Sequence, residues 1–107
     1  MSEASAVTVV SDLLAAAPIE SGKLGHHTVL KSEDVRVIVL AFEAGHVMKD
    51  HAAPKTLIMQ ALDGELRVVS EGTTMTLTPG TIVRFSAGVR HEVEAVANSR
   101  LMLTLIG

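Results

Sequence analysis

The chain has 107 residues, a net charge of -3 and no cysteine, which favours one cytoplasmic domain and excludes disulfides and thiolate metal sites. Hydrophobic residues make up 48% and charged residues 20%, a balance that excludes a disordered chain. Its basic residues are scattered among only two aromatic ones, and its apolar runs are too short for a membrane span. Neither nucleic acid nor a membrane is therefore expected as a partner.

The first quarter of the chain predicts little regular structure. Ser11 or Asp12 is a suitable N-cap for a short helix over residues 13–17. Residues 19–25 are polar and are expected to form a loop. We therefore treat residues 1–27 as an N-terminal extension that packs on the main domain or on a dimer partner.

Residues 28–107 show many short apolar runs separated by glycine-containing turns, which predicts an all-β sandwich or barrel. Asp63-Gly64 is a strong signal for a tight hairpin, and Glu71-Gly72 is a weaker one. The expected strands are 28–30, 35–42, 56–62, 65–70, 73–77, 82–85, 92–96 and 101–106.

Two of these strands, 35–42 and 101–106, are apolar on both faces. One face can line the core, but the other face also needs cover. Packing of the outer faces in a homodimer is the favoured explanation, because most soluble oligomers are symmetric homo-oligomers. An N-terminal segment folded over the same face is the alternative.

Two histidines, His51 and His91, lie in matching positions, each beside an apolar run and between turn glycines. We expect them on neighbouring strands with both imidazoles pointing into one cavity, where a small organic ligand would bind. Since alternate side chains of a strand share a face, the same cavity should be lined by Ala53, Leu57 and Met59.

A pair of imidazoles can also bind a divalent transition metal such as iron, manganese, nickel or zinc, although most such sites have three or four ligands. His46 is the first candidate for a third ligand, but it shares a face with His51 only if the backbone bends or bulges. The remaining polar candidates are expected elsewhere, either on the opposite face or in a solvent-exposed loop: Gln60, Asp50, Glu92, His26 and His27.

The spacing of these residues resembles two motifs of the cupin superfamily, specifically its small single-domain conserved-barrel members. The first motif places glycine, two histidines, glutamate and glycine at positions that are here Gly45, His51, Ala53, Leu57 and Gly64. The second places glycine, proline, glycine, histidine and asparagine at Gly80, Ser86, Gly88, His91 and Ala95.

This resemblance implies an antiparallel β-barrel of two packed sheets, a jelly roll or double-stranded β-helix, over residues 28–107, often as a homodimer. The family's activities include those of dioxygenases, isomerases, epimerases, decarboxylases, storage proteins and sugar-sensing domains. In this chain Ala53 and Leu57 stand where the family has two of its four metal ligands.

Two functions therefore compete, and the sequence leaves the ligand and any catalytic residue unknown. The first is a small-molecule-binding barrel whose pocket centres on His51 and His91. The alternative is a metal-dependent enzyme of dioxygenase or isomerase type, with His46 as a third ligand in a reduced shell. Metal-free acid-base catalysis is a weaker third hypothesis, because no carboxylate is expected to orient either histidine.

Overall fold

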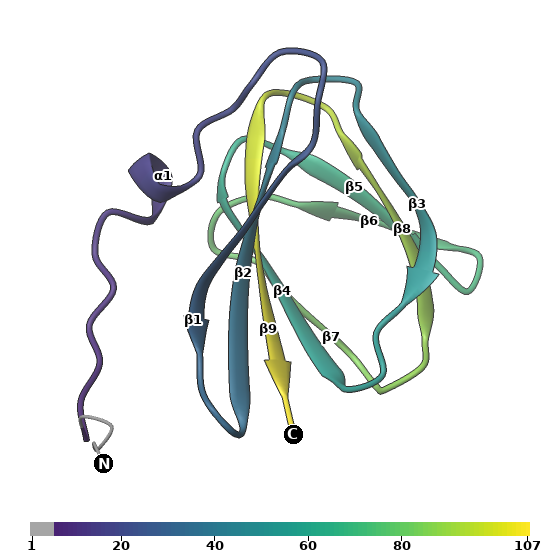
Figure 1. Cartoon of the computed structure of the whole chain (residues 1–107). Helices are drawn as coiled ribbons and strands as arrows, with labels where there is room; N and C mark the ends of the chain where they lie inside the picture. Colours follow the sequence, from purple (N-terminus) through teal and green to yellow (C-terminus); the bar gives the residue numbers. More distant parts are fainter. Residues whose placement is uncertain (1–5) are drawn as a thin grey trace.

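A computed structural model describes residues 6–107, and within this range almost all regular structure is β-strand (Figure 1). One short helix precedes the strands. In chain order the elements are α1 (Leu13–Ala16), β1 (Gly25–Lys31), β2 (Val35–Phe42), β3 (Val47–Ala52), β4 (Thr56–Asp63), β5 (Leu66–Ser70), β6 (Thr73–Leu77), β7 (Ile82–Phe85), β8 (Arg90–Ala95) and β9 (Ser99–Ile106).

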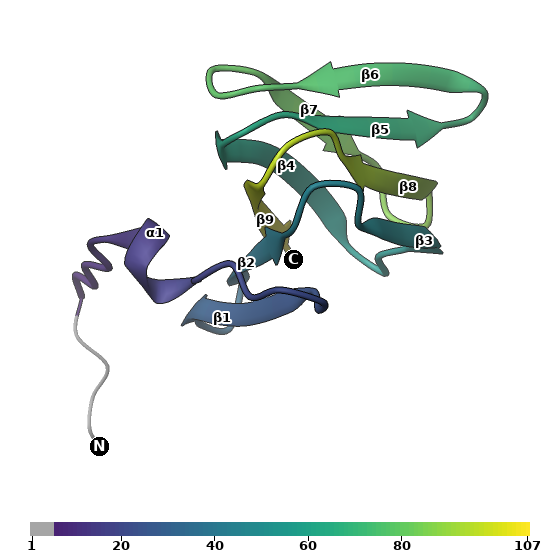
Figure 2. The ribbon, with the colours of Figure 1, turned by 90° about the horizontal axis from the view of Figure 1, so that it is seen from above.

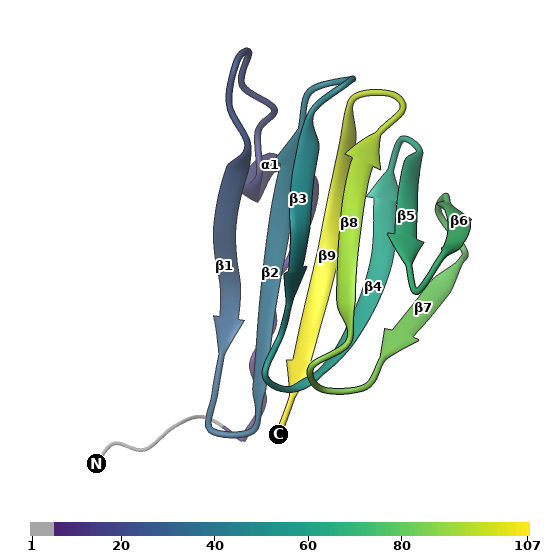
Figure 3. The ribbon, with the colours of Figure 1, turned by 90° about the vertical axis from the view of Figure 1, so that its right-hand side faces the viewer.

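The strands form two antiparallel sheets that pack face to face. The larger sheet has the order β1-β2-β9-β4-β7 and the smaller one the order β3-β8-β5-β6. Figures 2 and 3 show these two layers from above and from the side. The predicted all-β class and jelly-roll type of fold are confirmed. Among residues 6–107 no ladder joins the two sheets, so the molecule is a sandwich with open edges and not a closed barrel.

The core lies between the sheets and contains alternate residues of most strands, as the period of a half-buried strand requires. Its buried residues are Ile38, Leu40, Phe42, Leu57, Met59, Ala61, Leu66, Val68, Leu77, Phe85, Val93, Ala95, Leu101 and Leu103. The hydrophobic effect of burying this surface is the main contribution to the stability of the sandwich.

The outer face of the larger sheet is partly covered by the N-terminal segment. Ala17 is fully buried against Val39 and Ala41 of β2, and Figure 2 shows α1 on the outer side of this sheet. The Arg100 Nε donates a hydrogen bond of 2.7 Å to the carbonyl oxygen of Ala17. The same guanidinium contacts the Asp63 carboxylate at 2.6 Å. The N-terminal segment thus accounts for part of the expected cover, and the homodimer stays a prediction.

The hairpin predicted at Asp63-Gly64 is wrong. β4 pairs with β7 and β9 in the larger sheet, whereas β5 pairs with β6 and β8 in the smaller one. The chain therefore crosses between layers at Gly64, which has a φ of 74° and so little space that a Cβ would lie 2.2 Å from the Ser99 Oγ. The predicted hairpin at Glu71-Gly72 does form, with positive φ at both residues and Ser70 paired with Thr73.

Two further local expectations differ from the structure. Asp12 occupies the N-cap position of α1, but its side chain makes no capping hydrogen bond and its φ is 58°. His26 and His27 belong to β1 instead of a loop. His26 is exposed as expected, whereas His27 is half-buried and its Nε2 is inaccessible to solvent. The reason is that pairing with β2 extends β1 back to Gly25.

One strand, β3, is absent from the predicted set. Its outward residues Lys49 and Asp50 are adjacent in sequence, which breaks the alternation by which a half-buried strand is recognised.

Within residues 6–107 there is no helix of the length and apolarity that a membrane span requires.

Candidate functional site

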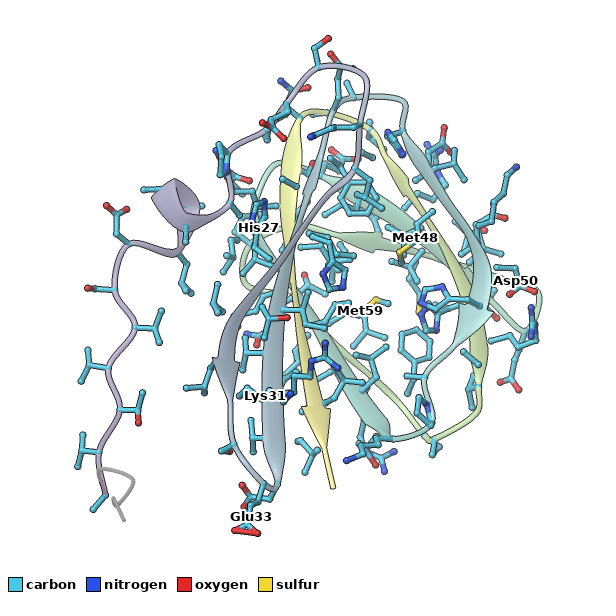
Figure 4. The ribbon with its side chains drawn as sticks, viewed as in Figure 1. His27, Lys31, Glu33, Met48, Asp50 and Met59 are labelled. Atoms are coloured by element: carbon cyan, nitrogen blue, oxygen red, sulfur yellow. The ribbon has the colours of Figure 1, made fainter. Side chains whose placement is uncertain are left out.

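The position of His51 is set by a shift in the pairing of β3 with β8. Met48 lies opposite Val93, and His51 lies opposite His91. Three steps along β3 thus correspond to two steps along β8, as in a β-bulge. Without the extra residue, Asp50 would lie opposite His91, and His51 would point to the other face. Figure 4 shows the result: Met48 points between the sheets and Asp50 lies on the outer side of β3.

The three rings of this region pack directly on one another. The centroids of the His51 and His91 rings are 4.6 Å apart, with the planes at 67°. Phe85 also stacks on His91, with centroids 4.9 Å apart and planes at 30°. His91 is only 1% exposed, whereas His51 is half-buried. The predicted approach of the two histidines is therefore seen, and the buried His91 ring packs against both His51 and Phe85.

Hydrogen bonds define which nitrogen of each imidazole remains free. The Nδ1 of His91 lies 3.3 Å from the carbonyl oxygen of Val89, and the Nδ1 of His51 lies 3.3 Å from that of Lys49. A carbonyl oxygen only accepts, so each Nδ1 carries the proton in these bonds. In the neutral rings each Nε2 then has a lone pair. The Nε2 of His91 is buried and has no hydrogen-bond partner within residues 6–107.

The surroundings of His91 favour its neutral form. Burial lowers the pKa of His91 below its ordinary value of 6.5, and the nearby His51 lowers it further. The hydrogen bond to Val89 and the charge of Asp50 act in the opposite direction but are weaker. At neutral pH His91 therefore presents an uncharged acceptor nitrogen inside the sandwich.

The residues expected to line the pocket belong to the packed interior. Leu57 and Met59 are fully buried core residues, and the half-buried Ala53 packs against the same core. Figure 4 shows Met59 between the two layers. The sequence prediction of their common inward face is confirmed for Leu57 and Met59 by burial.

Two of the cavities in the described part of the chain lie at the margins of this interior. One, of about 380 Å³, is lined by Phe85, Val89 and Met75, among others. The other, of about 330 Å³, lies between the β1–β2 hairpin and the loop before β4. Neither His51 nor His91 lines either of them. The first cavity does border two groups that touch His91, the stacked ring and its carbonyl partner.

The other polar candidates are not brought to the two histidines. His46 lies in the turn before β3 and has its nearest ring contact with Phe42, at 6.3 Å between centroids. Gln60 pairs with Met102 and Ile82 on the outer face of the larger sheet. Asp50 binds the Arg90 guanidinium at 2.7 Å on the outside of the smaller sheet, which agrees with its predicted outward direction.

The two imidazoles suggest a transition metal as cofactor, but two ligands alone form an incomplete metal site. The unpartnered Nε2 of His91 is a suitable ligand atom. Within the described part of the chain, however, no three His, Cys, Asp or Glu side chains come together as a ligand group. Two imidazoles alone do not fit a stably held metal, since such sites need three or four protein ligands.

Phe85 is the site residue that the sequence analysis missed. Its stacking on His91 depends on the pairing of β7 with β4, which puts Phe85 beside the inward-facing Leu57. The available signal was its place at the end of an apolar run inside the second glycine-histidine motif, directly before Ser86.

Comparison with models of protein families identifies the family of this chain. The model of the Cupin domain family matches residues 38–107. The chain belongs to the cupin family. A comparison with the curated protein sequences finds no match.

Several solved structures are similar over nearly the whole chain. An RmlC-like cupin from Desulfovibrio desulfuricans has a TM-score of 0.83 at 21% identity, covering 94% of this chain and 97% of its own. TT1209 from Thermus thermophilus has a TM-score of 0.78 at 26% identity, with coverages of 91% and 96%. KdgF from Halomonas sp. has a TM-score of 0.76 at 20% identity and covers 91% of each chain. These similarities establish a shared fold, and fold alone does not assign an activity.

Proposed function

We propose that this cupin domain binds a small organic molecule through His51 and His91, with a hydroxyl group of the ligand donating to an imidazole nitrogen. The single observation that carries the proposal is the buried Nε2 of His91, which has no partner within residues 6–107. A buried polar atom without a partner costs about 1–3 kcal/mol. A ligand hydroxyl at this atom would remove that penalty.

The type of ligand group follows from the hydrogen bonds of the rings. Because the Nδ1 atoms face carbonyl oxygens, the free nitrogens of the neutral rings are acceptors. They therefore select a ligand that donates, such as an alcohol. The depressed pKa of His91 keeps the acceptor form dominant at neutral pH. His51 is half-buried, so its ring is partly exposed to solvent next to the buried ring of His91.

A metal-dependent cupin enzyme of dioxygenase or isomerase type is the second candidate. The same free lone pair on His91 supports it, because a divalent cation such as iron, manganese, nickel or zinc also binds an unprotonated Nε2. A third protein ligand is missing, so we rank this candidate below the binding module. Elemental analysis of protein purified without chelators checks it, and a near-stoichiometric transition metal would reverse the ranking.

Two isomeric probes test the binding proposal. 1-Hexanol donates a hydrogen bond, and 1-methoxypentane has the same atoms without a donor. We expect 1-hexanol to bind saturably and to shift the imidazole nitrogen signals of His91 in ¹H–¹⁵N spectra, with 1-methoxypentane much weaker.

The variant His51→Ala/His91→Ala should lose this discrimination while remaining folded. The control His26→Ala/His46→Ala should keep it, because neither residue is placed at the pair. Equal binding of both probes, or no shift at His91, would contradict the proposal. Circular dichroism and urea unfolding show whether each variant remains folded.

A further inference from the structure

One end of the sandwich combines a cavity with a local excess of positive charge. The cavity of about 330 Å³ lies where the β1–β2 hairpin approaches the loop before β4, and Lys31, Arg36 and Lys55 line it together with Glu33. We call these three cationic residues the basic end. Figure 4 shows Lys31 at the end of β1 and Glu33 at the tip of the hairpin.

Arg36 belongs by its position to the inward face of the larger sheet. Side chains of a strand alternate, and the next residues of β2 in this phase, Ile38 and Leu40, are buried core residues. Arg36 is exposed only because it lies at the end of the sheet, where the core stops. Its guanidinium is thus placed at an entrance to the space between the sheets.

A continuous row of paired residues connects Arg36 with the histidine site. Arg36 lies opposite Leu105, which lies opposite Leu57, which lies opposite Phe85. Phe85 stacks on His91. Three strand spacings of about 4.8 Å separate the ends of this row, a length that an arginine side chain and a six-carbon ligand match together. Leu57 and Phe85 are buried in the core along this row, so a ligand that reaches His91 has to displace their packing.

The two cations nearest this row are placed against each other. Lys31 lies directly opposite Arg36 in the β1–β2 ladder, and like charges in that relation destabilise a sheet. Neither side chain has a hydrogen bond or ion pair within residues 6–107. The third cation, Lys55, donates to the carbonyl oxygen of Gly107. An anion bound between Lys31 and Arg36 would turn this repulsion into attraction.

We propose that the basic end binds the carboxylate of a hydroxylated organic acid, whose carbon chain extends inward past Leu105 toward His51 and His91. The proposal rests on the proposed function, because the ligand's hydroxyl is the group that reaches the histidines. Arg36 supplies a planar donor fork that matches a carboxylate, and Lys31 adds a second charge. The ligand class is thereby narrowed from any alcohol to a hydroxy acid.

The probes for this proposal are 6-hydroxyhexanoate and 1,6-hexanediol, which share a six-carbon chain and one hydroxyl group. We expect 6-hydroxyhexanoate to bind at least about tenfold more tightly, a difference typical of charge-assisted hydrogen bonds. In ¹⁵N-labelled protein it should shift the amide signals of Lys31, Arg36 and Leu105 as well as the ring signals of His91. The variant K31Q/R36Q should lose the preference, so that both probes bind with similar affinity.

The control variant K23Q/R67Q removes the same charge from sites that do not line the cavity, and it should retain the preference. If the wild-type protein binds both probes with equal affinity and both shift the His91 ring signals, the carboxylate site is overturned and the proposed function remains intact. A second outcome is that 6-hydroxyhexanoate binds more tightly than 1,6-hexanediol and loses this advantage in K31Q/R36Q, while the His91 ring signals do not shift. This result would support the basic end and contradict the proposed function. Absence of saturable binding by either probe would overturn both.

Discussion

His51 lies directly opposite His91 across the β3–β8 ladder, and the centroids of the two rings are 4.6 Å apart. Two imidazoles at this distance cannot both be protonated without repulsion, and burial adds to the cost for His91. Burial and the neighbouring ring therefore favour the neutral, acceptor form of His91 at neutral pH. This relationship makes the stability of the domain dependent on pH.

Stability should decrease as the pH falls below about 6.5. The pKa of His91 is lowered in the folded protein, first by burial and second by His51, so the unfolded chain takes up a proton at a higher pH than the folded one. The contribution of neutral His91 to the free energy of unfolding is complete above pH 6.5, the ordinary pKa of histidine. It is lost as the pH falls toward the lower pKa of His91 in the folded protein. Urea unfolding from pH 8 to pH 5 measures this slope.

The replacement His51→Gln should raise the pKa of His91 toward its ordinary value, because it removes the second cause of the shift. NMR titration of the His91 ring in both proteins measures the change. The replacement His26→Gln is the control, since His26 is exposed in β1. A His91 that titrates at or above 6.5 in the wild-type protein would contradict the neutral site.

The stacking of Phe85 on His91 predicts different effects for the two phenylalanines of the chain. Phe85→Leu and Phe42→Leu each remove a buried ring and should each cost about 1–2 kcal/mol of unfolding free energy. Only Phe85→Leu should move the ring proton signals of His91, because Phe42 instead contacts His46 at 6.3 Å. A similar shift of the His91 ring proton signals in both variants would show that stacking by Phe85 does not orient His91.

Gly64 should be much less tolerant of substitution than Gly22. Both have positive φ, but a Cβ on Gly64 would meet the Ser99 Oγ at 2.2 Å, whereas one on Gly22 meets nothing within 4 Å. Gly22→Ala should lower the free energy of unfolding by about 1–2 kcal/mol, because alanine disfavours the left-handed backbone conformation. Gly64→Ala should cost about 2 kcal/mol more because of overpacking. Equal unfolding free energies of the two variants would refute the close approach.

The contact between Arg100 and the N-terminal segment can be tested by Arg100→Lys. Lysine keeps the charge but lacks the fork that joins the Ala17 carbonyl to the Asp63 carboxylate. We expect a loss of about 1–3 kcal/mol of unfolding free energy and faster amide exchange at Ala17 and Ile19. Arg67→Lys, at an exposed pair with Glu94, should cost less than about 1 kcal/mol. Unchanged amide exchange at Ala17 and Ile19 would mean that Arg100 does not hold this segment.

Much of the sandwich could be read from the chain because the information is local. The runs 35–42, 73–77 and 82–85 coincide with β2, β6 and β7, since each combines strand-forming side chains with a turn at both ends. The hairpin at Glu71-Gly72 is equally local. Asp63-Gly64 has the same appearance but joins two different sheets, and nothing within a dipeptide records which strands pair.

The site divides in the same way. The positions of the glycines predict that His51 and His91 follow turns beside apolar strands, and side-chain alternation predicts that Leu57 and Met59 point inward. Both are properties of the chain and need no knowledge of distant contacts. Three features appear only in the folded molecule: β3 carries an extra residue opposite β8, Phe85 stacks on His91, and His46 lies away from the pair. The physical reason is that ladder register is set by contacts between distant strands, and a shift of one residue exchanges the inner and outer faces of a strand.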